Sequence, residues 1–125
     1  MQIYGYPGDR VDFVSKSGSA GSLLFGDPRS LAEEFFGQPH TSSQDGGEEA
    51  ISYFSESIVL RFDASGLRAV SIYPTRSKRE KVDVYLAKTR LSGLESAELN
   101  ELIEKSQGRL EVEADDSLQR ATFLR

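Results

Sequence analysis

Residues 58–73 constrain the fold more than any other part of the sequence, because hydrophobic residues alternate there on both sides of a short turn. From residue 58 to residue 63 every second side chain is large and apolar, which is the pattern of a strand with one buried face. Ala64-Ser65-Gly66 can reverse the chain with Gly66 in the left-handed conformation, and residues 67–73 return with Val70 and Ile72 on one face. This segment therefore predicts an antiparallel β-hairpin.

Similar short runs occur along the rest of the chain, and turns of hairpin length separate most of them. Further strands are predicted at residues 3–6, 11–14, 50–54, 82–86, 110–114 and 118–124. Because hairpin turns join neighbouring strands in antiparallel fashion, we predict a mostly antiparallel sheet of about six to eight strands. Residues 15–22 and 38–47 are small or polar and are predicted to be a flexible connection and a polar loop.

Two short helices complete the predicted α+β fold. Asp27 suits the N-cap of the first helix, Pro28 suits its first position, and Gly37 suits its end. Between them, apolar residues follow at i, i+4 spacing: Leu31 with Phe35 and Ala32 with Phe36. The second helix is predicted at residues 97–106, with Ser96 as its cap and with an apolar face formed by Leu99, Leu102 and Ile103.

The length of 125 residues is that of one ordinary domain, so residues 1–125 are predicted to form a single α+β domain. Phe35 and Phe62 are expected to share its core. A second interpretation is an imperfect duplication around residues 24–73 and 91–124. In both segments a leucine-led tripeptide ending in glycine precedes a helix and a pair of strands.

The sequence contains no cysteine, which excludes a disulfide framework and a thiolate metal site or nucleophile. The N-terminal residues lack the basic and apolar segments of a secretory signal, and no run of 18 apolar residues occurs. We therefore expect a cytoplasmic protein that makes no contact with a membrane.

The net charge of −5 disfavours a nucleic-acid partner bound through general attraction to phosphate. The charges are unevenly distributed: residues 68–90 contain seven basic and two acidic residues, whereas residues 91–117 contain eight acidic and two basic residues. Such runs can simply contact solvent. Alternatively, the acidic stretch forms a surface directed at a basic partner, where charge raises the association rate.

Candidate catalytic or cofactor-binding residues are few. His40 is the only histidine, which excludes a two-histidine metal site, and no Gly-x-Ser-x-Gly elbow surrounds any serine. The paired carboxylates, such as Glu33-Glu34, have polar neighbours, so nothing places a carboxylate pair in the apolar setting that acid–base catalysis would need. No glycine-rich phosphate loop is present, and the basic run 76–81 is typical of a solvent-exposed loop. The sequence predicts a protein that is not an enzyme and binds no cofactor or metal.

One longer pattern resembles known proteins. Gly26-Asp27-Pro28-Arg29-Ser30-Leu31 leads to Phe36-Gly37-Gln38-Pro39, and an aromatic-led pair of strands follows from Tyr53-Phe54 onward. This layout resembles small bacterial binding modules in which a helix precedes an antiparallel meander: the β-lactamase inhibitor protein family, modules of outer-membrane assembly lipoproteins, and toxin immunity proteins. The resemblance implies binding of a protein through the sheet face and loops, without active residues.

The leading hypothesis is a non-catalytic protein-binding module, specifically an immunity-type inhibitor of a basic toxin. The residues predicted to contact that partner are acidic and lie in the polar loop or on one face of a late strand: Asp45, Glu48, Glu49, Glu111 and Glu113. A ligand-binding or regulatory domain is the alternative, with an apolar pocket between helices and sheet lined by Phe35, Phe36, Tyr53 and Phe62. A third hypothesis is an enzyme whose active site is an unfamiliar pair of carboxylates.

Overall fold

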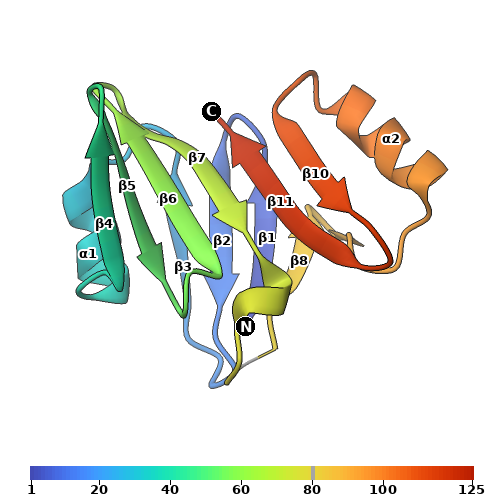
Figure 1. Ribbon diagram of the computed structural model, residues 1–125, viewed down its shortest axis with the longest axis horizontal. Coiled ribbons are helices and arrows are strands. Elements are labelled where there is room, and N and C mark those ends of the chain that lie inside the picture. Colours follow the sequence, from blue (N-terminus) through green and yellow to red (C-terminus); the bar gives the residue numbers. More distant parts are fainter. Residues whose placement is uncertain (80) are drawn as a thin grey trace.

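The computed structural model describes residues 1–79 and 81–125, which form two β-sheets packed face to face (Figure 1). The first sheet has five strands in the order β3-β2-β1-β8-β9. Its strands are β1 (Gln2–Tyr6), β2 (Arg10–Val14), β3 (Ala20–Leu24), β8 (Asp83–Leu86) and β9 (Thr89–Arg90). β1 and β8 run parallel, whereas the other neighbours in this sheet are antiparallel.

The second sheet has six strands in the order β10-β11-β7-β6-β5-β4, and all of its neighbouring strands are antiparallel. Its strands are β4 (Thr41–Asp45), β5 (Glu48–Tyr53), β6 (Ile58–Asp63), β7 (Gly66–Ile72), β10 (Leu110–Ala114) and β11 (Leu118–Leu124). Helix α1 (Arg29–Phe36) lies near the β4 edge, and helix α2 (Ser96–Lys105) lies near the β10 edge (Figure 1). A short 3₁₀ helix, η1 (Pro74–Arg76), follows β7.

The predicted α+β class with two helices and mostly antiparallel sheet is confirmed, but the described chain has eleven strands rather than six to eight. Segment 38–47, predicted as a polar loop, contains β4, and segment 15–22 runs from the β2–β3 turn into β3. Both strands lie at a sheet edge, and every residue of β4 is exposed. A strand without a buried face has no reason to alternate apolar and polar residues, which is why the sequence pattern missed it.

The cap of α1 also differs from the prediction. Pro28, rather than Asp27, occupies the N-cap position, and the Asp27 side chain instead accepts a hydrogen bond from the Leu24 backbone N–H at 2.8 Å. This contact fixes the turn that leads out of β3. Among the described residues, no helix is long and apolar enough to cross a membrane.

The core lies between the two sheets and combines the inward-facing side chains of both. Ile3, Val11 and Phe13 come from the five-stranded sheet, and Leu60 and Phe123 come from the six-stranded sheet. Leu99 of α2 is buried against the same cluster, with Leu102 and Ile103 half-buried beside it, as the apolar face of this helix predicted. The cluster is continuous across the described chain, so both sheets share one core.

The expected core pair is only half correct, because Phe62 is 5% exposed whereas Phe35 is 41% exposed. Helix α1 directs Ala32 and Phe36 toward the sheets, and Ala32 is completely buried. Phe35 instead lies over Gly21 of β3, so closely that a Cβ atom at Gly21 would overlap its ring. Phe35 therefore covers an edge strand at the surface.

Gly66 lies in the β6–β7 turn of the six-stranded sheet and has a φ of +95°, which confirms the predicted left-handed conformation. The next residue, Leu67, donates its backbone N–H to the Asp27 carbonyl at 2.8 Å. The Leu67 carbonyl accepts a hydrogen bond from the Gly26 backbone N–H at 2.9 Å. These two bonds tie the segment after β3 to the start of β7. The turn thus positions α1 relative to the six-stranded sheet.

Candidate functional site

The five acidic residues predicted to contact a partner do not form one surface. Asp45 and Glu48 lie at the β4–β5 hairpin, whereas Glu111 and Glu113 lie on β10, at the opposite edge of the six-stranded sheet. Four strand spacings separate β5 from β10, which amounts to about 19 Å at roughly 4.8 Å per strand. Glu49 points to the other face of the sheet, toward α1.

Arginine side chains from other elements bind four of these five carboxylates. Arg68 bonds to Glu48 at 2.9 Å, and Arg29 bonds to Glu49 at 2.6 Å. Arg120 lies 3.5 Å from Glu111 and 3.9 Å from Glu113, which do share one face of β10 as predicted. Asp45 is exposed at the hairpin. Each of the four other carboxylates is therefore already paired with a positive charge of this chain.

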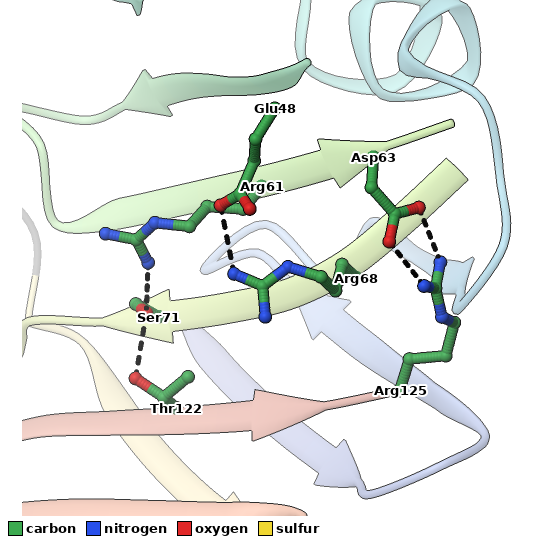
Figure 2. Close-up of polar contacts among 7 residues, drawn as sticks. All are labelled: Glu48, Arg61, Asp63, Arg68, Ser71, Thr122 and Arg125. Atoms are coloured by element: carbon green, nitrogen blue, oxygen red, sulfur yellow. Dashed lines mark hydrogen bonds and ion pairs between the residues drawn. The ribbon is translucent and has the colours of Figure 1, made fainter. Parts of the chain in front are cut away.

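The outer face of the six-stranded sheet carries a connected row of polar contacts, and neither α1 nor α2 lies over it (Figure 1). Arg61 donates to the Ser71 hydroxyl at 3.1 Å, and Ser71 is hydrogen-bonded to Thr122 at 2.8 Å (Figure 2). Arg120 donates to the same Thr122 hydroxyl at 2.7 Å. Most of the polar side chains on this sheet face are therefore bonded to one another, although the Nε of Arg68 is buried without a hydrogen-bond partner among the described residues.

Arg125 forms a bidentate contact with Asp63 at the end of this face, with N–O distances of 2.9 and 2.5 Å (Figure 2). This hydrogen bonding, together with the backbone N–H of Ser65, lowers the pKa of Asp63 to about 2. The pKa is depressed in the folded state, so the resulting stability is present above the unfolded value of about 3.9 and is lost as the pH falls through about 2.

We therefore expect Arg125→Gln to remove part of the acid sensitivity of the wild-type protein between pH 4 and pH 2. Urea unfolding at several pH values in this window measures it as the slope of stability against pH. Lys88→Gln, which removes an exposed positive charge on the β8–β9 turn, is the control and should leave the slope unchanged. An identical slope for Arg125→Gln and wild type would contradict the role of this pair.

A cluster of aromatic rings surrounds the end of α1. Phe36 lies at its centre, with ring centroids 5.0 Å from Phe13, 4.6 Å from Phe35, 4.8 Å from Tyr53 and 5.8 Å from Phe54. Burial raises the pKa of Tyr53, whose hydroxyl donates to the Gly37 carbonyl at 3.0 Å and so fixes the end of the helix. The inner half of the cluster is therefore firmly packed.

The outer half of the cluster is exposed to solvent, and we name it the aromatic surface: Leu31, Phe35, Phe36 and Phe54. Leu31 is 40% exposed, Phe35 41% and Phe54 43%. A hollow of about 250 Å³, the aromatic hollow, opens between these rings and is lined mainly by apolar side chains, including Met1 and Phe13. Large exposed apolar groups that adjoin one another typically mark an interaction site.

Phe54 stands at a hairpin tip with an unusual backbone. Phe54, Ser55 and Glu56 have φ values of 53°, 58° and 64°, so three successive non-glycine residues are left-handed. Each such residue costs about 1–2 kcal/mol relative to the right-handed region. The surroundings hold the tip: the Ser57 backbone N–H bonds to the Phe54 carbonyl at 3.1 Å, and Arg76 reaches the Glu56 carbonyl at 3.4 Å. The strained tip keeps Phe54 at the surface.

A second hollow of about 570 Å³, the basic hollow, shares Phe54 with the first. Its lining is polar and basic: His40, Ser55, Ser77, Lys78 and Arg79 complete it. Within residues 1–79 and 81–125, neither Lys78 nor Arg79 forms an ion pair. The run 76–81 was predicted to be a solvent-exposed loop, and nothing in the sequence indicates that Lys78 and Arg79 lie beside Phe54.

The alternative pocket was predicted to be lined by Phe35, Phe36, Tyr53 and Phe62. Phe35 and Phe36 do line the aromatic hollow, whereas Tyr53 packs behind Phe36 and Phe62 lies in the core. In the part of the chain that the structure describes, no three His, Asp or Glu side chains come together in a way that could hold a metal ion.

No protein-family model, curated protein or solved structure matches this chain.

Proposed function

We propose that this protein is a non-catalytic protein-binding module and that the aromatic surface is its docking site. The proposal depends on one observation: Phe35 and Phe54 line one hollow, Leu31 lies beside Phe35 at the surface, and all three are exposed by 40% or more. Fully burying a large apolar side chain contributes about 1.5–3 kcal/mol, so covering the exposed parts of these three supplies about 2–4 kcal/mol. That corresponds to an affinity gain of roughly 30- to 700-fold.

The geometry of the cluster also favours binding. Aromatic side chains supply much of the energy at protein interfaces, especially where they are already fixed in the free protein. Here Phe36 is held by edge contacts with Phe13 and Phe35, and the hairpin tip holds Phe54. A partner would therefore meet side chains that lose little freedom on binding.

Affinity capture with two matched surface variants tests the docking site. We expect the Phe35→Ser, Phe54→Ser double variant to fold and to lose the proteins that the wild type captures from its source cells. The comparison variant is Glu111→Lys with Glu113→Lys, at the opposite edge of the sheet, and it should retain them. The reverse outcome would contradict our proposal and favour the expected acidic surface with a basic partner, as in an immunity-type inhibitor.

A small-molecule ligand is the second candidate, because the basic hollow of about 570 Å³ falls in the usual size range of ligand pockets. Native mass spectrometry of protein purified without denaturation distinguishes the two. A bound small molecule that disappears with Lys78→Glu would support this candidate over a protein partner.

A further inference from the structure

We infer that the partner presents an acidic, extended segment, with one large apolar side chain in the aromatic hollow and its neighbouring carboxylates in the basic hollow. This inference builds on the proposed function, since it assigns a chemical class to the partner. It reverses the charge expected from the sequence, where acidic residues of this chain were to meet a basic partner. The two hollows carry it, because Phe54 forms a wall of both.

The size of the aromatic hollow indicates what enters it. At about 250 Å³ it is smaller than the 300–1,000 Å³ that is usual for whole small-molecule ligands. Its lining of Met1 and phenylalanine rings suits one apolar side chain, which would be buried on several sides. A single anchoring side chain in a fitted hollow is a common arrangement at protein interfaces.

Basic residues surround the aromatic hollow on more than one side. The basic hollow adjoins it at Phe54, and a third hollow of about 370 Å³ adjoins it at Ser15 and contains Lys16 and Arg79. Arg79 lines both the basic and the third hollow, so each of the three hollows shares a lining residue with the other two.

The positive charges in this region are available to a partner. In the described chain Lys16, Lys78 and Arg79 are exposed and form no ion pair, whereas Arg76 stacks on the Tyr73 ring at 3.7 Å. Glu56 is exposed at the same hairpin tip but lines none of the three hollows. The overall charge of −5 does not prevent attraction here, because salt screens distant charges beyond about 8 Å at physiological ionic strength.

A peptide segment fits this arrangement better than a nucleic acid does. Single-stranded nucleic acids need a basic track along the backbone and open ring faces for base stacking. Here the cations gather on either side of a small apolar hollow, and Phe36 and Phe54 meet edge to face with an interplanar angle of 81°. A peptide that carries an apolar side chain between carboxylates would match an apolar hollow that has basic residues on either side.

Fluorescence anisotropy with synthetic probes tests the inference. The main probe is a short fluorescein-labelled peptide with one central phenylalanine among aspartates and glutamates. Three comparison probes replace its phenylalanine by alanine, replace its acids by lysines, or substitute oligothymidylate for the peptide. We expect only the main probe, the acidic phenylalanine peptide, to bind. Its affinity should fall as the salt concentration is raised, because the charge pairs are partly exposed.

Variants locate the binding on the protein. Lys78→Glu with Arg79→Glu should weaken binding of the acidic peptide by about tenfold or more. Lys88→Glu with Arg109→Glu changes the net charge equally at exposed positions that line none of the three hollows, and it should have little effect. Equal losses for the two double variants would show only general attraction and would overturn the inference.

The outcomes separate this inference from the proposed function. If affinity capture depends on Phe35 and Phe54 but the acidic peptide does not bind, the docking site stands and the acidic class is wrong. Stronger binding of the lysine peptide would overturn the inference in favour of a basic partner. Binding of oligothymidylate that Lys78→Glu abolishes would overturn it in favour of a nucleic acid.

Discussion

Replacing Gly66 by alanine is expected to lower the free energy of unfolding by about 3 kcal/mol or more, because both the backbone angle and the space forbid a side chain. The φ of +95° strains any non-glycine residue. In addition, the new Cβ would overlap the Gly26 carbonyl and lie 2.9 Å from the Asp27 carbonyl oxygen. The Asp27 carbonyl oxygen accepts the backbone N–H of Leu67, and Gly26 donates its own N–H to the Leu67 carbonyl. Moving either peptide group to relieve the overlap therefore disturbs the link between the two sheets.

Gly18→Ala is the matched control for this experiment. Gly18 has nearly the same φ, +93°, but no atom lies within 4 Å of the position its Cβ would take. Gly18→Ala should therefore lower the free energy of unfolding only through backbone strain, by about 1–2 kcal/mol. Urea titration of both variants measures the difference, and equal losses would show that the contact at Gly66 adds nothing.

Phe123→Ala is expected to cost about 3–5 kcal/mol, since its ring is completely buried between the two sheets. The ring lies directly against the backbone of Gly5 in β1, where a Cβ would overlap it. Gly5→Ala alone should cost about 1–3 kcal/mol through overpacking. In the Phe123→Ala background this cost should largely disappear, because the shortened side chain leaves room for the methyl group.

A double-mutant cycle of these two changes measures how tightly the sheets pack. A coupling energy of about 1 kcal/mol or more is the expected result. Strict additivity would show that β1 and β11 do not meet at this point, and the face-to-face arrangement of the sheets would need revision.

The parts of the fold that the sequence predicted are those in which one strand has one buried and one exposed face. The β6–β7 hairpin was predicted because Ile58, Leu60 and Phe62 alternate with smaller or charged residues, and they are buried as expected. β3 was missed because only Leu23 of its five residues, AGSLL, is buried, so the sequence of the strand shows no alternation of large apolar and polar residues. Phe35 of α1 covers Gly21 from outside the strand, and no pattern within β3 reports this contact.

The candidate site was less predictable for a related reason. The sequence shows that Glu48, Glu111 and Glu113 are acidic, but it does not show which arginines lie beside them. Those arginines come from other strands, and pairing between strands is not visible in the local sequence. The exposure of Phe54 depends on a left-handed tip that contains no glycine. Left-handed turns are normally recognised by Gly or Asn, and neither residue occurs at positions 54–56, so this turn could not be predicted.

The left-handed tip also limits how far stability and affinity can be raised together in this protein. Glycine at position 55 or 56 would adopt the same backbone without strain and would make the molecule more stable. A glycine tip would also have more alternative shapes, and Phe54 would then spend less time in the orientation that our proposed docking site requires. Selection for heat tolerance and selection for affinity would therefore change this hairpin in opposite directions.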